Sequence, residues 1–91
     1  MRKDIPSFVT KLANSDGLEV SVRIGKGGIT ESLISELSEQ LSRRRIVKVK
    51  ANKGIVPNRE NRNSFFSEIA TKSSSQIVFQ RGNVAVFWSG K

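Results

Sequence analysis

Residues 22–33 read Val-Arg-Ile-Gly-Lys-Gly-Gly-Ile-Thr-Glu-Ser-Leu, and the other elements of the chain are best understood from this stretch. An alternating apolar run ends at a turn of three glycines and one lysine, and an amphipathic segment starts directly after it. The pattern predicts a strand, a loop and a helix. Glycine has no side chain and tolerates positive φ, so another molecule can approach the backbone there, and the first helical turn offers unpaired N–H groups. With Lys26 between the glycines, the loop has the features of an anion-binding site.

The residues before this loop predict a short helix and a strand. Residues 5–14 form the helix, with Pro6 suited to its first turn and with Phe8, Val9 and Leu12 along one apolar stripe. Residues 14–17 read as a turn. From residue 18 to residue 24 apolar and polar side chains alternate, which is typical of a strand with one covered face.

The residues after the loop predict an amphipathic helix that ends in three arginines. Its apolar positions recur at helical spacing and comprise Ile29, Leu33, Ile34, Leu37 and Leu41. Thr30 or Gly28 caps its start, and Glu39 is correctly spaced to pair with Arg43. The run Arg43-Arg44-Arg45 lies where the helix dipole favours positive charge.

A second strand follows at residues 46–51, with its two lysines on one side. Val47, Val49 and Ala51 share the other side. We therefore expect Lys48 and Lys50 on the open face of the sheet, together with Arg23.

The last third of the chain predicts a helix and a hairpin. The helix spans residues 59–72, takes its apolar positions from Phe65, Phe66, Ile69 and Ala70, and ends at three serines. The hairpin strands are residues 76–80 and 84–88, with a turn at residues 81–83. The sequence does not determine which hairpin residues point toward the core, because either of two alternating sets could do so. One set is Ile77, Phe79, Ala85 and Phe87, and the other is Val78, Val84, Val86 and Trp88.

The element order is therefore (α)βαβαββ, an α/β chain of the α+β two-layer type. Right-handed crossovers place the two main helices on one face of a mixed four-stranded sheet. The other face is open unless the N-terminal segment covers part of it. Ninety-one residues amount to one small domain, which we take to span residues 1–91.

Charge is unevenly distributed along the chain. Sixteen Lys and Arg against eight Asp and Glu give a net charge of +8. Residues 1–42 carry five bases and six acids, residues 43–53 carry six bases and no acid, and residues 54–91 carry five bases and two acids. A basic block beside a balanced first half favours a polyanion as the partner.

Composition excludes several classes of site. The chain has no cysteine and no histidine, which removes disulfides, thiolate nucleophiles, imidazole bases and nearly every zinc or transition-metal site. The acids are scattered and no serine has an evident base, so we expect no enzyme, no cofactor and no small-molecule substrate. Residues 1–6 lead into no long apolar run, and the long helix is acidic on its polar face, so we expect a soluble cytoplasmic monomer without membrane binding.

The glycine loop matches one of three nucleotide-binding motifs. A Walker loop requires a Gly-Lys-Ser/Thr ending after four intervening residues, and a dinucleotide fingerprint requires a glycine where Thr30 stands. Gly25, Lys26, Gly27 and Gly28 fit the Gly-x-x-Gly clamp that holds a nucleic-acid backbone in the KH fold. The alternative for these four residues is a tight turn that binds nothing.

The strand ending Val-Arg-Ile-Gly-Lys-Gly-Gly-Ile-Thr-Glu, the acidic helix, and the following Arg-Arg-Arg-Ile-Val-Lys-Val-Lys resemble the CRM domain, named for chloroplast RNA splicing and ribosome maturation. The free-standing prokaryotic form, the YhbY-like proteins, is the nearest counterpart, and residues 77–88 resemble its closing hairpin. The resemblance implies a fold like the C-terminal domain of a bacterial translation initiation factor. It also implies RNA binding, with a large-ribosomal-subunit precursor as the partner of the prokaryotic members. The chain departs from the family in its short N-terminal helix and in Ser89, where arginine is common.

We therefore predict a non-catalytic RNA-binding protein that acts on ribosomal RNA during ribosome assembly. The predicted RNA-binding residues are Arg23, Gly25, Lys26, Gly27, Gly28, Arg43, Arg44, Arg45, Lys48 and Lys50. Lys53, Arg59 and Arg62 extend this basic track, and Trp88 is the best candidate for base stacking, although a core position is favoured for it. Two alternatives stand beside this prediction: a protein–protein recruitment module on ribosomes, and a nucleic-acid packaging protein like the Alba family.

Overall fold

The computed structural model describes residues 5–15, 17–52 and 59–90, and within these it confirms the expected order of elements. The three helices are α1 (Ser7–Ala13), α2 (Glu31–Arg44) and α3 (Arg59–Lys72). The four strands are β1 (Val20–Ile24), β2 (Ile46–Ala51), β3 (Gln76–Arg81) and β4 (Val84–Trp88). Element ends differ from the prediction by one or two residues, which is the usual uncertainty at a fraying end.

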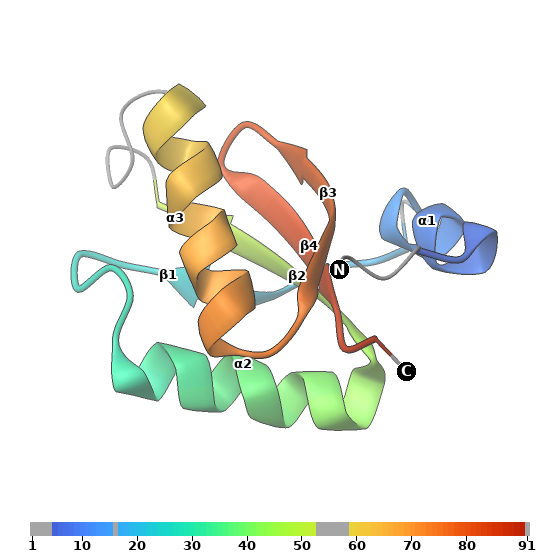
Figure 1. Ribbon diagram of the computed structural model, residues 1–91, viewed down its shortest axis with the longest axis horizontal. Helices are drawn as coiled ribbons and strands as arrows, with labels where there is room; N and C mark the ends of the chain where they lie inside the picture. Colours follow the sequence, from blue (N-terminus) through green and yellow to red (C-terminus); the bar gives the residue numbers. More distant parts are fainter. Residues whose placement is uncertain (1–4, 16, 53–58, 91) are drawn as a thin grey trace.

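The four strands form one mixed sheet in the order β1-β2-β4-β3. The edge strand β1 runs parallel to β2, whereas β4 is antiparallel to both β2 and β3. Helices α2 and α3 lie together on one face of the sheet, and α1 lies on the other side, as Figure 1 shows. The two-layer arrangement is thus confirmed, and the N-terminal helix covers part of the second face.

The main core lies between the sheet and helices α2 and α3. Leu33, Leu37 and Leu41 of α2 are buried against the apolar side of β1 and β2, and burial of each such side chain stabilises the fold by roughly 1.5–3 kcal/mol. Phe66 of α3 is fully buried and its ring centroid lies 6.3 Å from that of Phe87 in β4. The predicted core role of the two phenylalanines is confirmed, with Phe65 partly buried beside Phe66.

A second, smaller core lies between α1 and the other face of the sheet. Val9 and Ala13 of α1 pack there with Ile46, Val86 and Trp88. The predicted stripe of this helix was wrong at two of its three positions, because Phe8 is 59% exposed and Leu12 is 52% exposed. A seven-residue helix turns only one narrow side to the sheet, and Val9 and Ala13, four residues apart, occupy that side.

The hairpin buries both of its faces, which resolves the competition between its two apolar sets. Ile77, Ala85 and Phe87 join the helix-covered core, whereas Val86 and Trp88 join the α1 cluster. The strict alternation fails because β3 has an irregularity between Ile77 and Phe79, and it transfers Phe79 to the α1 side. Trp88 is only 4% exposed, so it is a core residue and offers no surface for base stacking.

Candidate nucleic-acid interface

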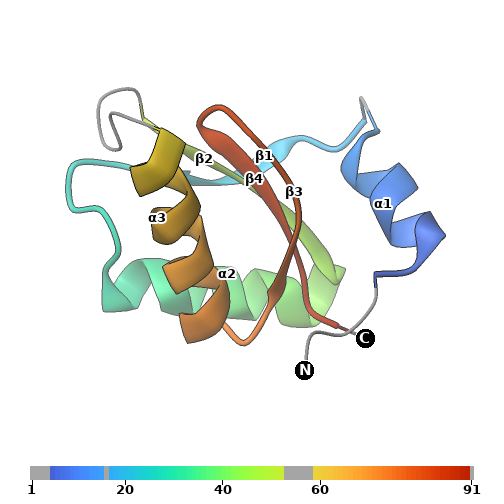
Figure 2. The ribbon, with the colours of Figure 1, turned by 45° about the horizontal axis from the view of Figure 1, so that its top comes forward.

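The glycine loop is a hydrogen-bonded turn between β1 and α2. The N–H of Gly28 donates to the carbonyl of Gly25 at 3.0 Å, and Asn52 N–H donates to the carbonyl of Ile24 at 2.9 Å just before the turn. The second bond ties the base of the loop to the end of β2. The loop therefore projects from the sheet on a fixed base, and it stands clear of α1 (Figure 2).

Only one of the three glycines is required by the backbone conformation. Gly28 has φ +65°, where any other L residue is strained. A Cβ at Gly25 would lie 3.9 Å from the Asn52 amide nitrogen, and one at Gly27 would lie 3.4 Å from the Thr30 methyl. Both positions have room for a small side chain, so the fold alone does not demand glycine at either one.

The start of α2 is capped by Thr30, one of the two residues that the sequence allowed, and not by Gly28. Its hydroxyl accepts a hydrogen bond of 3.1 Å from the Leu33 N–H, which satisfies one of the free donors of the first turn. The loop and this first turn line a shallow depression of about 260 Å³ that includes Arg23, Gly27 and the Ser32 hydroxyl. Glu36 also lines it, so the depression combines hydrogen-bond donors and one arginine with one carboxylate.

Arg23 and Lys50 lie beside each other on the side of the sheet away from α2 and α3, in a part that α1 does not cover. They are directly paired residues of β1 and β2, and both are exposed. Lys48 lies two residues earlier on the same side, is half-buried, and donates to the Leu18 carbonyl at 3.3 Å. The predicted grouping of these three cations on one face is confirmed.

The three arginines at the end of α2 lie away from the glycine loop. Helix α2 has 14 residues, so its ends are about 20 Å apart at 1.5 Å per residue. Arg44 reaches back to the Ser21 hydroxyl at 3.0 Å, at the start of β1 and not at its loop end. The structure therefore does not unite Arg43, Arg44 and Arg45 with Lys26 in one continuous surface.

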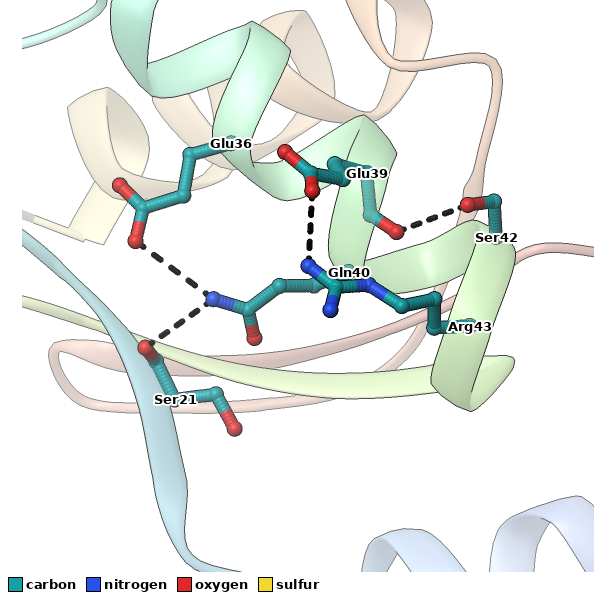
Figure 3. Close-up of polar contacts among 6 residues, drawn as sticks. All are labelled: Ser21, Glu36, Glu39, Gln40, Ser42 and Arg43. Carbon is teal, nitrogen blue, oxygen red and sulfur yellow. Dashed lines mark hydrogen bonds and ion pairs between the residues drawn. The ribbon is translucent and has the colours of Figure 1, made fainter.

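Polar and acidic side chains occupy the stretch of α2 between these two ends, as Figure 3 shows. The Glu39 carboxylate accepts from the Arg43 guanidinium at 2.8 Å, which confirms the predicted pair. Gln40 donates to the Ser21 carbonyl and to Glu36, both at 3.5 Å. Because Glu36 and Glu39 project here, the flank of α2 interrupts the cationic surface that the sequence suggested.

The three residues predicted to extend the basic track have different outcomes. Lys53 lies outside the described residues, and so does the side chain of Arg59. Arg62 of α3 shares a depression of about 320 Å³ with Arg81 and Gly82 of the hairpin. Sequence reasoning missed Arg81, because its nearness to the other cations depends on the strand order β1-β2-β4-β3.

Features of other site classes are scarce among the described residues. No three acidic side chains in this part of the chain lie close enough together to hold a metal ion. No helix described here is long and apolar enough to cross a membrane.

A strand, a Gly-x-x-Gly turn and an acidic amphipathic helix on a βαβαββ sheet together define a compact α+β class of domain. Comparison with protein families identifies which one: residues 8–89 match the CRS1/YhbY (CRM) domain, and the chain belongs to this family. Among solved structures, the chain is similar to a hypothetical protein from Staphylococcus aureus, described as a candidate RNA-binding protein and determined in solution. The two share 23% identity with a TM-score of 0.72, over 89% of this chain and 79% of the other, which supports the same fold. A search of functionally curated proteins found no significant match.

Proposed function

We propose that this protein binds RNA without catalysing a reaction, and that the glycine loop with the neighbouring sheet face contacts the sugar-phosphate backbone. Membership of the CRM family and the fold shared with a candidate RNA-binding protein support this function. One observation carries the role of the loop: glycine occupies positions 25 and 27 although the local conformation does not require it. The missing side chains leave the backbone of Gly25 and Gly27 exposed beside Lys26, so a phosphate group can approach it closely.

The charge distribution favours a polyanion at the same place. Arg23, Lys26 and Lys50 are exposed, and no hydrogen bond or ion pair is found for their side chains within the described residues. Cations held in internal pairs lose part of their attraction for phosphate, whereas these three retain it. Their position at the loop end of the sheet therefore makes that end the strongest electrostatic contact for RNA.

The expected ligand is ribosomal RNA in a precursor of the large subunit, and the expected setting is ribosome assembly in the cytoplasm by a monomeric protein. The sedimentation of the native protein tests this directly. After a cell extract is separated on a sucrose gradient, the protein should appear in fractions that contain large-subunit precursors. If it sediments only with free protein, this ligand is wrong.

Salt dependence and a loop variant test the mode of binding. With about five phosphate contacts, log affinity should fall against log salt with a slope of about −3.5 to −4.5. Replacing Lys26→Asp and Gly27→Asp together should weaken binding to labelled large-subunit ribosomal RNA while thermal unfolding stays cooperative. The matched control is Ser7→Asp with Lys11→Asp, which makes the same charge change on exposed positions of α1. Equal losses in both double variants would show a general charge effect and would refute the role of the loop.

A protein–protein module is the second candidate, and one observation favours it. Phe8 and Leu12 lie four residues apart on α1 and both project into solvent, which forms a small apolar surface. Nuclease treatment of the extract before affinity capture separates the two functions. A complex held by protein contacts survives the treatment, whereas a complex bridged by RNA is lost.

A further inference from the structure

One row of residues crosses the whole sheet at the end nearest the glycine loop. Arg23 of β1 is paired with Lys50 of β2, Lys50 with Val84 of β4, and Val84 with Arg81 of β3. Neighbouring strands lie about 4.8 Å apart, so this row spans about 14 Å from its first residue to its last. We call these four residues the cationic row.

The side chains of the cationic row point to the same face of the sheet. Paired residues on adjacent strands share a face, and successive residues along a strand alternate. The neighbours Ile24, Ala51 and Ala85 are all buried in the core beneath α2 and α3. Gln80, next to Arg81, donates to Asn63 of α3 at 2.8 Å. The row therefore faces away from these two helices.

Helix α1 covers a different part of that face. Its cluster contains Ile46 and Trp88, which pair with each other at the opposite end of the strands, and Val86, one row closer. No member of the cationic row belongs to either core cluster, and Arg23, Lys50 and Arg81 are exposed. Figure 2 shows α1 on one side, with the glycine loop and the hairpin turn away from it.

The row is cationic without internal neutralisation. None of its side chains forms a hydrogen bond or ion pair within the described part of the chain, whereas Arg43 and Lys72 in the helical layer pair with Glu39 and Glu68. Lys48 lies two residues before Lys50 on β2, on the same face of the sheet, and adds a fourth cation. Glu36 lines the depression next to Arg23 but belongs to α2, in the helical layer.

Both ends of the row continue into further cationic positions. Arg23 is separated from the glycine turn by Ile24 alone, so Lys26 follows at one end. At the other end Arg81, on the edge strand β3, shares a depression with Arg62 of α3, which lies in the helical layer at this edge of the sheet. A surface that begins at the loop thus extends over four strands to the hairpin turn.

We propose that the RNA backbone crosses the sheet along the cationic row, perpendicular to the strands, and that Arg81 is a phosphate contact at the end far from the glycine loop. This inference rests on the proposed function and extends it from the loop to the hairpin. The row contains no aromatic side chain, so the contact is electrostatic and independent of base sequence.

The variant Arg81→Gln tests this inference, because glutamine retains a polar side chain but loses the charge. Removing one phosphate contact should reduce the salt slope by about 0.7–0.9, which at about 0.15 M salt corresponds to a four- to sixfold loss of affinity. The double variant Lys50→Gln with Arg81→Gln should lose about two such contacts. Fluorescence anisotropy with labelled large-subunit ribosomal RNA at several salt concentrations measures both quantities.

Lys72→Gln is the matched control, since it removes the same charge from the helical layer and should leave the salt slope unchanged. If Arg81→Gln leaves the salt slope unchanged while the glycine-loop variant still loses affinity, RNA does not follow the cationic row, and the proposed function stands. If the unaltered protein shows no salt-dependent RNA binding, both proposals fail. A second readout uses the unaltered chain: on titration with the same RNA, the amide NMR signals of Arg81 and Val84 should shift, and that of Phe8 should not.

Discussion

Arg45 offers a sharp test of how α2 ends. Its φ is +70° and its ψ is −36°, a conformation that L residues rarely adopt, and it is held there by two backbone hydrogen bonds. Its N–H donates to Leu41 at 3.0 Å, and its carbonyl accepts from Ser89 at 2.8 Å. The chain must reverse sharply here to enter β2, so the strain is imposed by the fold.

The variant Arg45→Gly should be more stable than Arg45→Ala by about 1 kcal/mol. Positive φ destabilises an L residue such as alanine by roughly 1–2 kcal/mol. Glycine avoids this strain, but its greater flexibility in the unfolded chain offsets about 0.5–1 kcal/mol of the advantage. Both variants remove the same guanidinium, so charge and dipole effects cancel in the comparison. For a domain of this size the difference corresponds to about 4–8 °C in melting temperature. Thermal unfolding followed by circular dichroism measures it.

At the neighbouring residue we expect the opposite order of stability between the glycine and alanine variants, so the two positions together test the explanation. Arg44 is the last helical residue of α2, and there Arg44→Gly should be less stable than Arg44→Ala by about 1 kcal/mol. If the glycine variant is less stable than the alanine variant at both positions, the backbone of Arg45 is not strained, and the explanation of the helix end is wrong.

Three further predictions concern the folding of the same elements and are checked by chemical denaturation. Thr30→Ala should cost about 1 kcal/mol, because it removes the hydroxyl that caps α2. Val9→Ala should cost about 2 kcal/mol, since the side chain is fully buried beneath α1, whereas Leu12→Ala should change stability by less than about 0.5 kcal/mol; equal effects would show that α1 does not pack as described. Glu39→Gln should also stay within about 0.5 kcal/mol, because its pair with Arg43 is about two-thirds exposed on both sides and is screened by water.

Elements with a single clear periodicity could be predicted from the sequence. The stripe of α2 and the alternation of β2 each specify one buried side, and the structure buries that side in both cases. The hairpin could not be resolved, because its two faces are both apolar and both covered. The irregularity after Ile77 changes which residues of β3 point to each face of the sheet, and no local sequence pattern predicts it.

The candidate site was predictable only where its residues are close in sequence. The glycine loop and the facing of Lys48 and Lys50 follow from local patterns. The link from Lys50 to Arg81 depends on β4 lying between β2 and β3, which is a property of tertiary structure. The same limit explains the arginines of α2: their closeness to the loop in sequence suggested one surface, and the length of the helix separates them from it.

The position of α1 explains how one face of the sheet can be buried at one end and exposed at the other. A longer helix would cover the full length of the strands, but seven residues extend over only about 10 Å. Its apolar contacts end at Val86, and in the next row of the sheet three of the four residues, Arg23, Lys50 and Arg81, are cations. The acids Glu39 and Glu68 lie in the helical layer on the opposite side of the sheet. Arg43 and Lys72 neutralise these two acids, whereas the cations of the cationic row have no internal partner among the described residues, so we expect a polyanion to approach from the side of the row.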